Sequence, residues 1–215
     1  MFALEQLFNE LELNKKISSF DSFHTTYKAN NARLWKAYGE GTIDKNHLRY
    51  ERFRSTLTAF DIHNELVVKQ MSDGYVDLSP KLTHLFPKTL ETLNELSQSN
   101  YNLHIITNGF KEVQYTKLHQ AKLAPFFNVV VCSEEVGKNK PSPEIFKHAM
   151  RLAEAKPDQS VMIGDDFEID IIGALNAGMN GIHFNPEVTK TQKDDTVIQC
   201  ISELPDLLPS LFRGY

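Results

Sequence analysis

Residues 161–170, Val-Met-Ile-Gly-Asp-Asp-Phe-Glu-Ile-Asp, place an apolar run suited to a buried strand directly before a glycine and a cluster of carboxylates. Like charges gathered at the end of an apolar strand are costly unless a cation offsets them. Mg²⁺ binds hard oxygen ligands of this kind, taking one or two protein carboxylates together with water and phosphate. The same carboxylates also suit the start of a helix, where Asp is a favoured cap. Residues 161–170 therefore predict either a metal site or an acidic helix cap.

Strands and helices alternate on both sides of this segment. Strands that alternate with helices imply right-handed crossovers and an α/β fold with a doubly wound parallel sheet, whose ligands bind beyond the carboxyl ends of the strands. A polar loop is expected at 186–195. Apolar runs predict strands at 103–107, 129–132, 161–164 and 181–184, and helical patterns predict helices at 88–97, 111–121, 143–155, 168–177 and within 202–211.

The first part of the chain has a different texture, with helical periodicity and no convincing strand between residues 4 and 74. Asp21 is expected to cap a long helix, Gly39 and Gly41 to end it, and Asp44 to lie near the start of the next helix. A further helix is expected at 63–72. The sequence thus predicts two domains, a small antiparallel helical bundle at 1–78 and an α/β domain at 79–215.

Composition excludes several classes of protein. The 215 residues include 41% hydrophobic and 24% charged residues, as in ordinary globular proteins, and carry a net charge of −5. An acidic balance argues against binding to nucleic acid or to a membrane surface, because both need a basic face. The two cysteines, Cys132 and Cys200, have no metal-like spacing and favour a reducing cytoplasmic location. No apolar run reaches the length of a membrane span, and residues 1–5 lack signal-peptide features.

Two further motifs lie at the expected carboxyl edge of the sheet. Thr107, Asn108 and Gly109 follow a strand and precede a helix, so the threonine hydroxyl and nearby amides suit a phosphate group, although a plain helix cap is an alternative. Lys140 stands just before Pro141 and the proline-initiated helix at 143, which restricts its approach. Its alternative is a solvated surface lysine.

In this order and spacing, the three motifs resemble motifs two, three and four of the haloacid dehalogenase superfamily of phosphohydrolases, over residues 103–184. The resemblance implies Mg²⁺ as cofactor. It implies catalytic and phosphate-binding roles for Thr107 and Lys140, and phosphate donors at Asn108 and Gly109. It also implies that Asp165 binds the metal directly and that Asp170 acts through water or by orienting other groups. Asp166 is a possible metal ligand whose role the resemblance leaves open.

The helical part resembles the cap of pyrimidine 5'-nucleotidases within this superfamily, in the stretches 20–23, 31–41 and 49–53. Such caps lie over the active site and select the leaving group. The resemblance implies that Trp35, Tyr38 and Arg52 contact a base. Burial in the helical core is the more common fate of such residues, because helices readily bury aromatic stripes.

The superfamily's first motif, a strand followed by Asp-x-Asp, does not occur in this sequence. In the family that strand lies centrally, between the strands that end at Thr107 and at Gly164, and its first aspartate attacks phosphorus. Losing such a strand forfeits about 6–15 kcal/mol of apolar burial. We therefore expect about two dozen further residues upstream in the active polypeptide, the size of one strand and its loop. We expect these 215 residues to be weakly active or inactive.

Three functions remain open from the sequence. The leading one is a Mg²⁺-dependent nucleotidase acting on small phosphate esters, with pyrimidine nucleoside monophosphates as substrates and a monomer or homodimer as the working form. The second is a phosphatase of the same superfamily that acts on phosphoglycolate or sugar phosphates. The third is a non-catalytic relative that binds phosphate or a nucleotide.

Overall fold

The computed structural model describes residues 2–188 and 196–212. It divides into two compact units, Met1–Thr83 and His84–Tyr215. Asp194 and Asp195, and most of the predicted loop at 186–195, lie outside the described residues. No helix in the described part of the chain has the length and apolar character needed to cross a bilayer.

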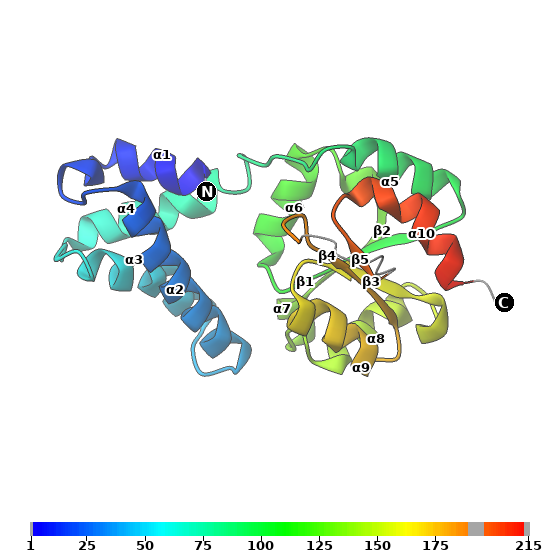
Figure 1. Ribbon diagram of the computed structural model, residues 1–215. Helices are drawn as coiled ribbons and strands as arrows, with labels where there is room; N and C mark the ends of the chain where they lie inside the picture. Colours follow the sequence, from blue (N-terminus) through cyan, green and yellow to red (C-terminus); the bar gives the residue numbers. More distant parts are fainter. Residues whose placement is uncertain (1, 189–195, 213–215) are drawn as a thin grey trace. The chain divides into compact units, whose positions relative to one another are not determined.

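The first unit is helical. It contains α1 (Phe2–Glu10), a 3₁₀ turn (Leu13–Lys15), α2 (Phe20–Gly39), α3 (Lys45–Thr58) and α4 (Glu65–Leu78) (Figure 1). The apolar faces of these helices share one core, which includes the fully buried residues Phe23, Phe53, Leu57 and Met71. An antiparallel helical unit is thus stabilised mainly by burial of one stripe from each helix.

Local capping chemistry explains where these helices start. Ser19 caps α2, since its hydroxyl accepts from the Ser22 backbone N–H at 3.2 Å. Asp21, the predicted cap, lies instead in the first turn, where its charge suits the helix dipole. Asp44 caps α3 as predicted, by accepting from the His47 N–H at 2.8 Å. Asn64 caps α4, which extends to Leu78 and is longer than the predicted helix at 63–72.

The second unit alternates helices and parallel strands, as predicted. Its helices lie on both sides of the strands, with α5 and α10 over one face and α8 and α9 over the other (Figure 1). Two separate apolar clusters occupy these faces. The elements are α5 (Thr89–Gln98), β1 (Leu103–Thr107), α6 (Lys111–Gln120), β2 (Phe127–Cys132), α7 (Ser133–Val136), α8 (Pro143–Leu152), β3 (Val161–Gly164), a π-helical turn (Phe167–Ile172), α9 (Gly173–Asn176), β4 (Asn180–Phe184), β5 (Val197–Ile198) and α10 (Leu204–Leu211).

The strands form two hydrogen-bonded groups rather than one sheet. β1 pairs with β2, and β3 pairs with β4, which in turn pairs with β5; all pairs are parallel. Within the described residues, β1 and β3 are not paired with each other. Every residue of these two strands is only half-buried. The strands ending at Thr107 and Gly164, between which the sequence predicts a missing central strand, thus share no ladder in the described residues.

Candidate active site

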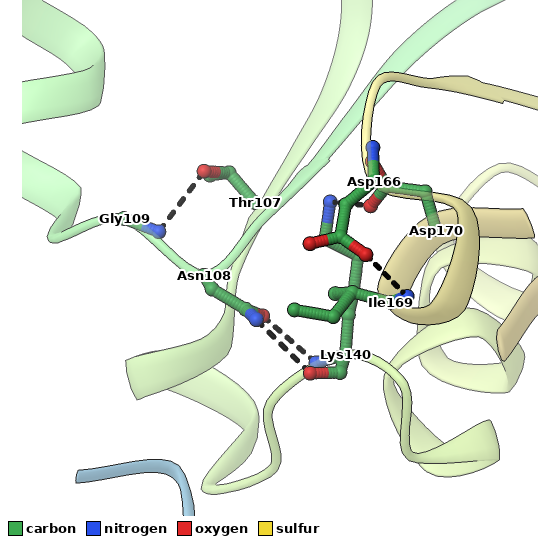
Figure 2. A network of polar contacts seen from close by, with 7 residues as sticks. All are labelled: Thr107, Asn108, Gly109, Lys140, Asp166, Ile169 and Asp170. Carbon is green, nitrogen blue, oxygen red and sulfur yellow. Dashed lines mark hydrogen bonds and ion pairs between the residues drawn. The ribbon is translucent and has the colours of Figure 1, made fainter. Parts of the chain in front are cut away.

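Thr107 is the last residue of β1, and its hydroxyl anchors the turn that follows. The Gly109 backbone N–H donates to Thr107 Oγ1 at 3.0 Å (Figure 2). A threonine hydroxyl has two acceptor lone pairs and one hydrogen to donate. The Gly109 contact uses one lone pair, so the Thr107 hydrogen stays available for a phosphate oxygen. The Gly109 N–H itself is engaged within the turn.

Asn108 joins this turn to the loop before α8. Its side-chain Nδ2 donates to the Lys140 carbonyl at 3.0 Å, and its Oδ1 accepts from the Lys140 backbone N–H at 2.8 Å. The Asn108 carbonyl lies 3.4 Å from Ser133 Oγ, which donates to it. Asn108 and Lys140 lie 32 positions apart, and each donates one hydrogen bond to the other. These two bonds hold the segment after β1 against the segment before α8.

Lys140 and Asp170 form a nearly buried ion pair. The Lys140 Nζ lies 2.6 Å from Asp170 Oδ1, and their side chains are 11% and 6% exposed. The second Asp170 oxygen accepts from the Asp166 backbone N–H at 3.2 Å. Lys140 is therefore not a solvated surface lysine. It is the central member of a chain of contacts that links the loops after β1 and β3 (Figure 2).

The two carboxylates directly after β3 differ in their surroundings. Asp166 caps the π-helical turn, because its Oδ1 accepts from the Ile169 N–H at 2.9 Å. Of the two alternatives that the sequence leaves open for residues 161–170, a metal site or a helix cap, Asp166 fulfils the helix cap. Asp165 is exposed, and its backbone carbonyl accepts from the His183 ring nitrogen at 3.1 Å. His183 was not predicted as a site residue. No sequence signal singles it out, because its position opposite Gly164 follows from the register of β3 and β4, which only the structure gives.

Whether the site suits Mg²⁺ depends on which of its carboxylates are already engaged in other contacts. In residues 2–188 and 196–212, no group of three or more His, Cys, Asp or Glu side chains is arranged to hold a metal. Asp170 is occupied by Lys140, and Asp166 by the helix start. The exposed Asp165 carboxylate fits an open magnesium site, because Mg²⁺ is commonly held by one or two carboxylates plus water and phosphate.

The residues predicted to contact a base lie in the helical unit. Arg52 is 5% exposed, with its guanidinium 4.8 Å from the ring centroid of Tyr75 and 5.1 Å from that of Phe53. Trp35 and Tyr38 are half-buried and pack edge to face against each other. Arg52 is therefore part of the core of its unit.

Comparison with known proteins gives consistent matches. The profile of the haloacid dehalogenase-like hydrolases matches residues 13–184. A glyceraldehyde 3-phosphate phosphatase of Methanothermobacter thermautotrophicus is 36% identical over 176 residues, which are 77% of this chain and 78% of that protein. The pyrimidine 5'-nucleotidase YjjG of Escherichia coli is 33% identical over 155 residues, 71% of this chain and 66% of that protein.

A solved structure also aligns along most of the chain. The HAD-hydrolase YfnB of Bacillus subtilis, crystallised with magnesium, superimposes with a TM-score of 0.84 at 26% identity, covering 97% of this chain and 90% of YfnB. A likeness of this extent includes both the helical unit and the α/β unit of the sequence.

Proposed function

This chain belongs to the family of haloacid dehalogenase-like hydrolases as a phosphatase-type enzyme, and from that premise we propose that it acts with Mg²⁺ on nucleoside monophosphates. The observation that carries the proposal is the placement of Lys140, whose ammonium pairs with Asp170 and whose main chain pairs with Asn108, the residue after Thr107. Phosphoryl transfer depends chiefly on positioning and on neutralising charge at the phosphoryl oxygens. A lysine held in this way, together with the Thr107 hydroxyl, serves both purposes.

Each site residue then has a proposed role. Thr107 donates its hydroxyl hydrogen to a phosphoryl oxygen, and Lys140 neutralises charge on the same group. Asp170 orients Lys140. The burial of Lys140 strengthens this effect, because a cation in a low-dielectric site acts more strongly than one in water.

Asp165 would hold the Mg²⁺ ion, which supplies positive charge next to the phosphate oxygens. Its exposure at the end of β3 supports this role, since an open site leaves room for water and substrate ligands. Asp166 has its side chain engaged at the helix start, so a metal-binding role there competes with capping. Asp165 is thus the first candidate of the three aspartates.

The attack on phosphorus needs a further group. The sequence contains no Asp-x-Asp pair that would supply a nucleophile and a general acid. We therefore expect residues 1–215 alone to bind phosphate esters better than they hydrolyse them. We also propose that the helical unit is a cap domain and that the α/β unit is the catalytic domain. The protein is proposed to be a cytoplasmic monomer or homodimer.

A second substrate class has its own support. The 36% identical relative is named as a phosphatase of glyceraldehyde 3-phosphate, a small sugar phosphate. The 33% identical relative is named as a pyrimidine 5'-nucleotidase. Sugar phosphates are therefore the alternative to nucleotides as substrates.

A substrate panel separates these functions. Release of phosphate from uridine and thymidine monophosphates is compared with release from glyceraldehyde 3-phosphate and phosphoglycolate, with Mg²⁺ or with EDTA. Calorimetry with inorganic phosphate and Mg²⁺ is run in parallel. Faster turnover of the nucleotides supports a nucleotidase, and faster turnover of glyceraldehyde 3-phosphate or phosphoglycolate supports the second substrate class. Binding with little turnover is the result expected of residues 1–215, which hold no Asp-x-Asp pair. Neither binding nor turnover in the presence of Mg²⁺ would overturn the proposed function.

A further inference from the structure

The side chain of Asn108 makes two hydrogen bonds to one residue. A carboxamide has two N–H donors and a carbonyl acceptor. In this protein, one N–H and the carbonyl oxygen of Asn108 both meet the main chain of Lys140, at 3.0 and 2.8 Å. The carboxamide of Asn108 thus pairs with the Lys140 main chain as one peptide group pairs with another in a β-sheet. The Asn108 side chain therefore faces the main chain of Lys140.

Asn108 holds the main chain of Lys140, whereas Asp170 holds its side-chain ammonium. A lysine ammonium sits on a flexible four-carbon stem, so its place depends on where the main chain is held as well as on its ion partner. Asp170 binds the ammonium at 2.6 Å, and Asn108 binds the backbone of the same residue. Lys140 is thereby anchored at both ends (Figure 2).

The same contact connects the two groups of strands. Asn108 follows β1, and Asp170 lies in the turn after β3, whereas these two strands share no ladder within the part of the chain that the structure describes. Lys140 contacts both residues. Lys140 is therefore a polar link between the Thr107 loop and the acidic loop.

We propose that Asn108 is a positioning residue: its side chain holds the main chain of Lys140, and through it the ammonium, in place and is not a ligand of the phosphate. The role in hydrolysis rests on the proposed function. The positioning of Lys140 does not, because it is a property of the protein without ligand.

Competitive acetylation of lysines by acetic anhydride, read by mass spectrometry, tests the proposal without substrate. The variants are Asn108→Ala, which removes both contacts, and Asn108→Asp, which keeps the acceptor for the Lys140 N–H and loses the donor. Asn102→Ala, an exposed asparagine just before β1, is the matched control. Exposed Lys147 on α8 is the internal reference.

We expect the acetylation rate of Lys140, relative to Lys147, to rise about tenfold in Asn108→Ala, because two hydrogen bonds are lost. Asn108→Asp should give an intermediate rise, and Asn102→Ala the wild-type rate. A wild-type rate at Lys140 in folded Asn108→Ala would overturn the proposal. If Asn108→Ala does not fold, a wild-type rate in Asn108→Asp overturns it equally.

A second readout distinguishes failure of the positioning role from failure of the proposed function. Calorimetry with inorganic phosphate and Mg²⁺ should show about tenfold weaker binding in Asn108→Ala than in Asn102→Ala, since the ammonium is displaced. If the wild-type protein binds no phosphate, the proposed function fails while the acetylation result still decides the role of Asn108. If Asn108→Ala speeds the acetylation of Lys140 but leaves the affinity for phosphate unchanged, the role of Lys140 in phosphate binding is overturned.

Discussion

Gly164 and Asp170 approach so closely that a Cβ atom at position 164 would lie 2.2 Å from Asp170 Oδ2 and 2.4 Å from Asp170 Cβ. Atoms at such distances overlap, and Asp170 is held in place by Lys140 and by the Asp166 N–H. The glycine at the end of β3 is therefore required for steric reasons. It lets the π-helical turn fold back onto the end of the strand, which brings the Asp170 carboxylate to Lys140.

We predict that Gly164→Ala destabilises the protein, because the added methyl group meets a side chain that cannot move away. Overpacking of this kind costs about 1–3 kcal/mol in the free energy of unfolding. Gly109→Ala is the matched control, since its Cβ would meet the far end of the flexible Gln114 side chain. Urea denaturation should show a clear loss for Gly164→Ala and a much smaller one for Gly109→Ala. Equal losses would contradict the steric account.

Replacing Asp170 by Asn leaves the Lys140 cation nearly buried without its counter-charge. Removal of one partner from a buried ion pair costs about 3–5 kcal/mol, whereas exposed pairs contribute about 0–1 kcal/mol. Asp77→Asn is the control, because the Lys81–Asp77 pair is 50% and 65% exposed. The midpoint of denaturant unfolding should fall strongly for Asp170→Asn and hardly change for Asp77→Asn. A small shift for both would show that Lys140 finds another partner.

Thr107→Val keeps the shape of the side chain but removes its hydroxyl. We expect this variant to bind inorganic phosphate about tenfold more weakly in the presence of Mg²⁺, in line with the loss of a hydrogen bond to a charged group. Thr107→Ser keeps the hydroxyl and should bind as the wild type does. Calorimetry on the three proteins measures the difference. Equal affinities of the Val and Ser variants would remove Thr107 from the phosphate site.

The two cysteines should differ sharply in reactivity. Burial raises the pKa of the Cys132 thiol to about 11, with the Glu135 and Glu134 carboxylates adding to the effect. At pH 8 such a thiol is ionised to about one part in a thousand, and the thiolate is the reactive form. The Ser202 hydroxyl lowers the pKa of Cys200, which is half-buried. Iodoacetamide at pH 8 should label Cys200 first, and faster labelling of Cys132 would contradict the burial of its side chain.

The sequence predicted the fold well where apolar runs end sharply. The strands at 103–107 and 161–164 have the predicted bounds, because Asn108-Gly109 and Gly164-Asp165 interrupt each run. β5 was not predicted, since its two residues form a strand only through pairing with β4. The helix cap was placed at Asp21 instead of Ser19, because both residue types are favoured caps and the choice depends on the path of the chain.

The sequence predicts a site of Thr107, Lys140 and Asp165, with Asp170 in a supporting role. In the structure, contacts run from Asn108, next to Thr107, through Lys140 to Asp170, while the metal-binding role of Asp165 stays a prediction. The pairing of Asn108 with the Lys140 main chain could not be predicted, because it joins residues 32 positions apart through geometry alone. The same holds for His183, which approaches the Asp165 carbonyl only because β3 and β4 pair in register.

The separation of β1–β2 from β3–β4–β5 has a consequence for local unfolding. Amide hydrogens in strands exchange with solvent through cooperative opening of the structure that protects them. Since no ladder joins the two groups within residues 2–188 and 196–212, we expect the amides of Ile106 and Ile163 to open in different cooperative units, although both strands lie in the same α/β unit. Deuterium uptake should therefore resolve two protection classes, and loss of the Lys140 contacts should uncouple them further.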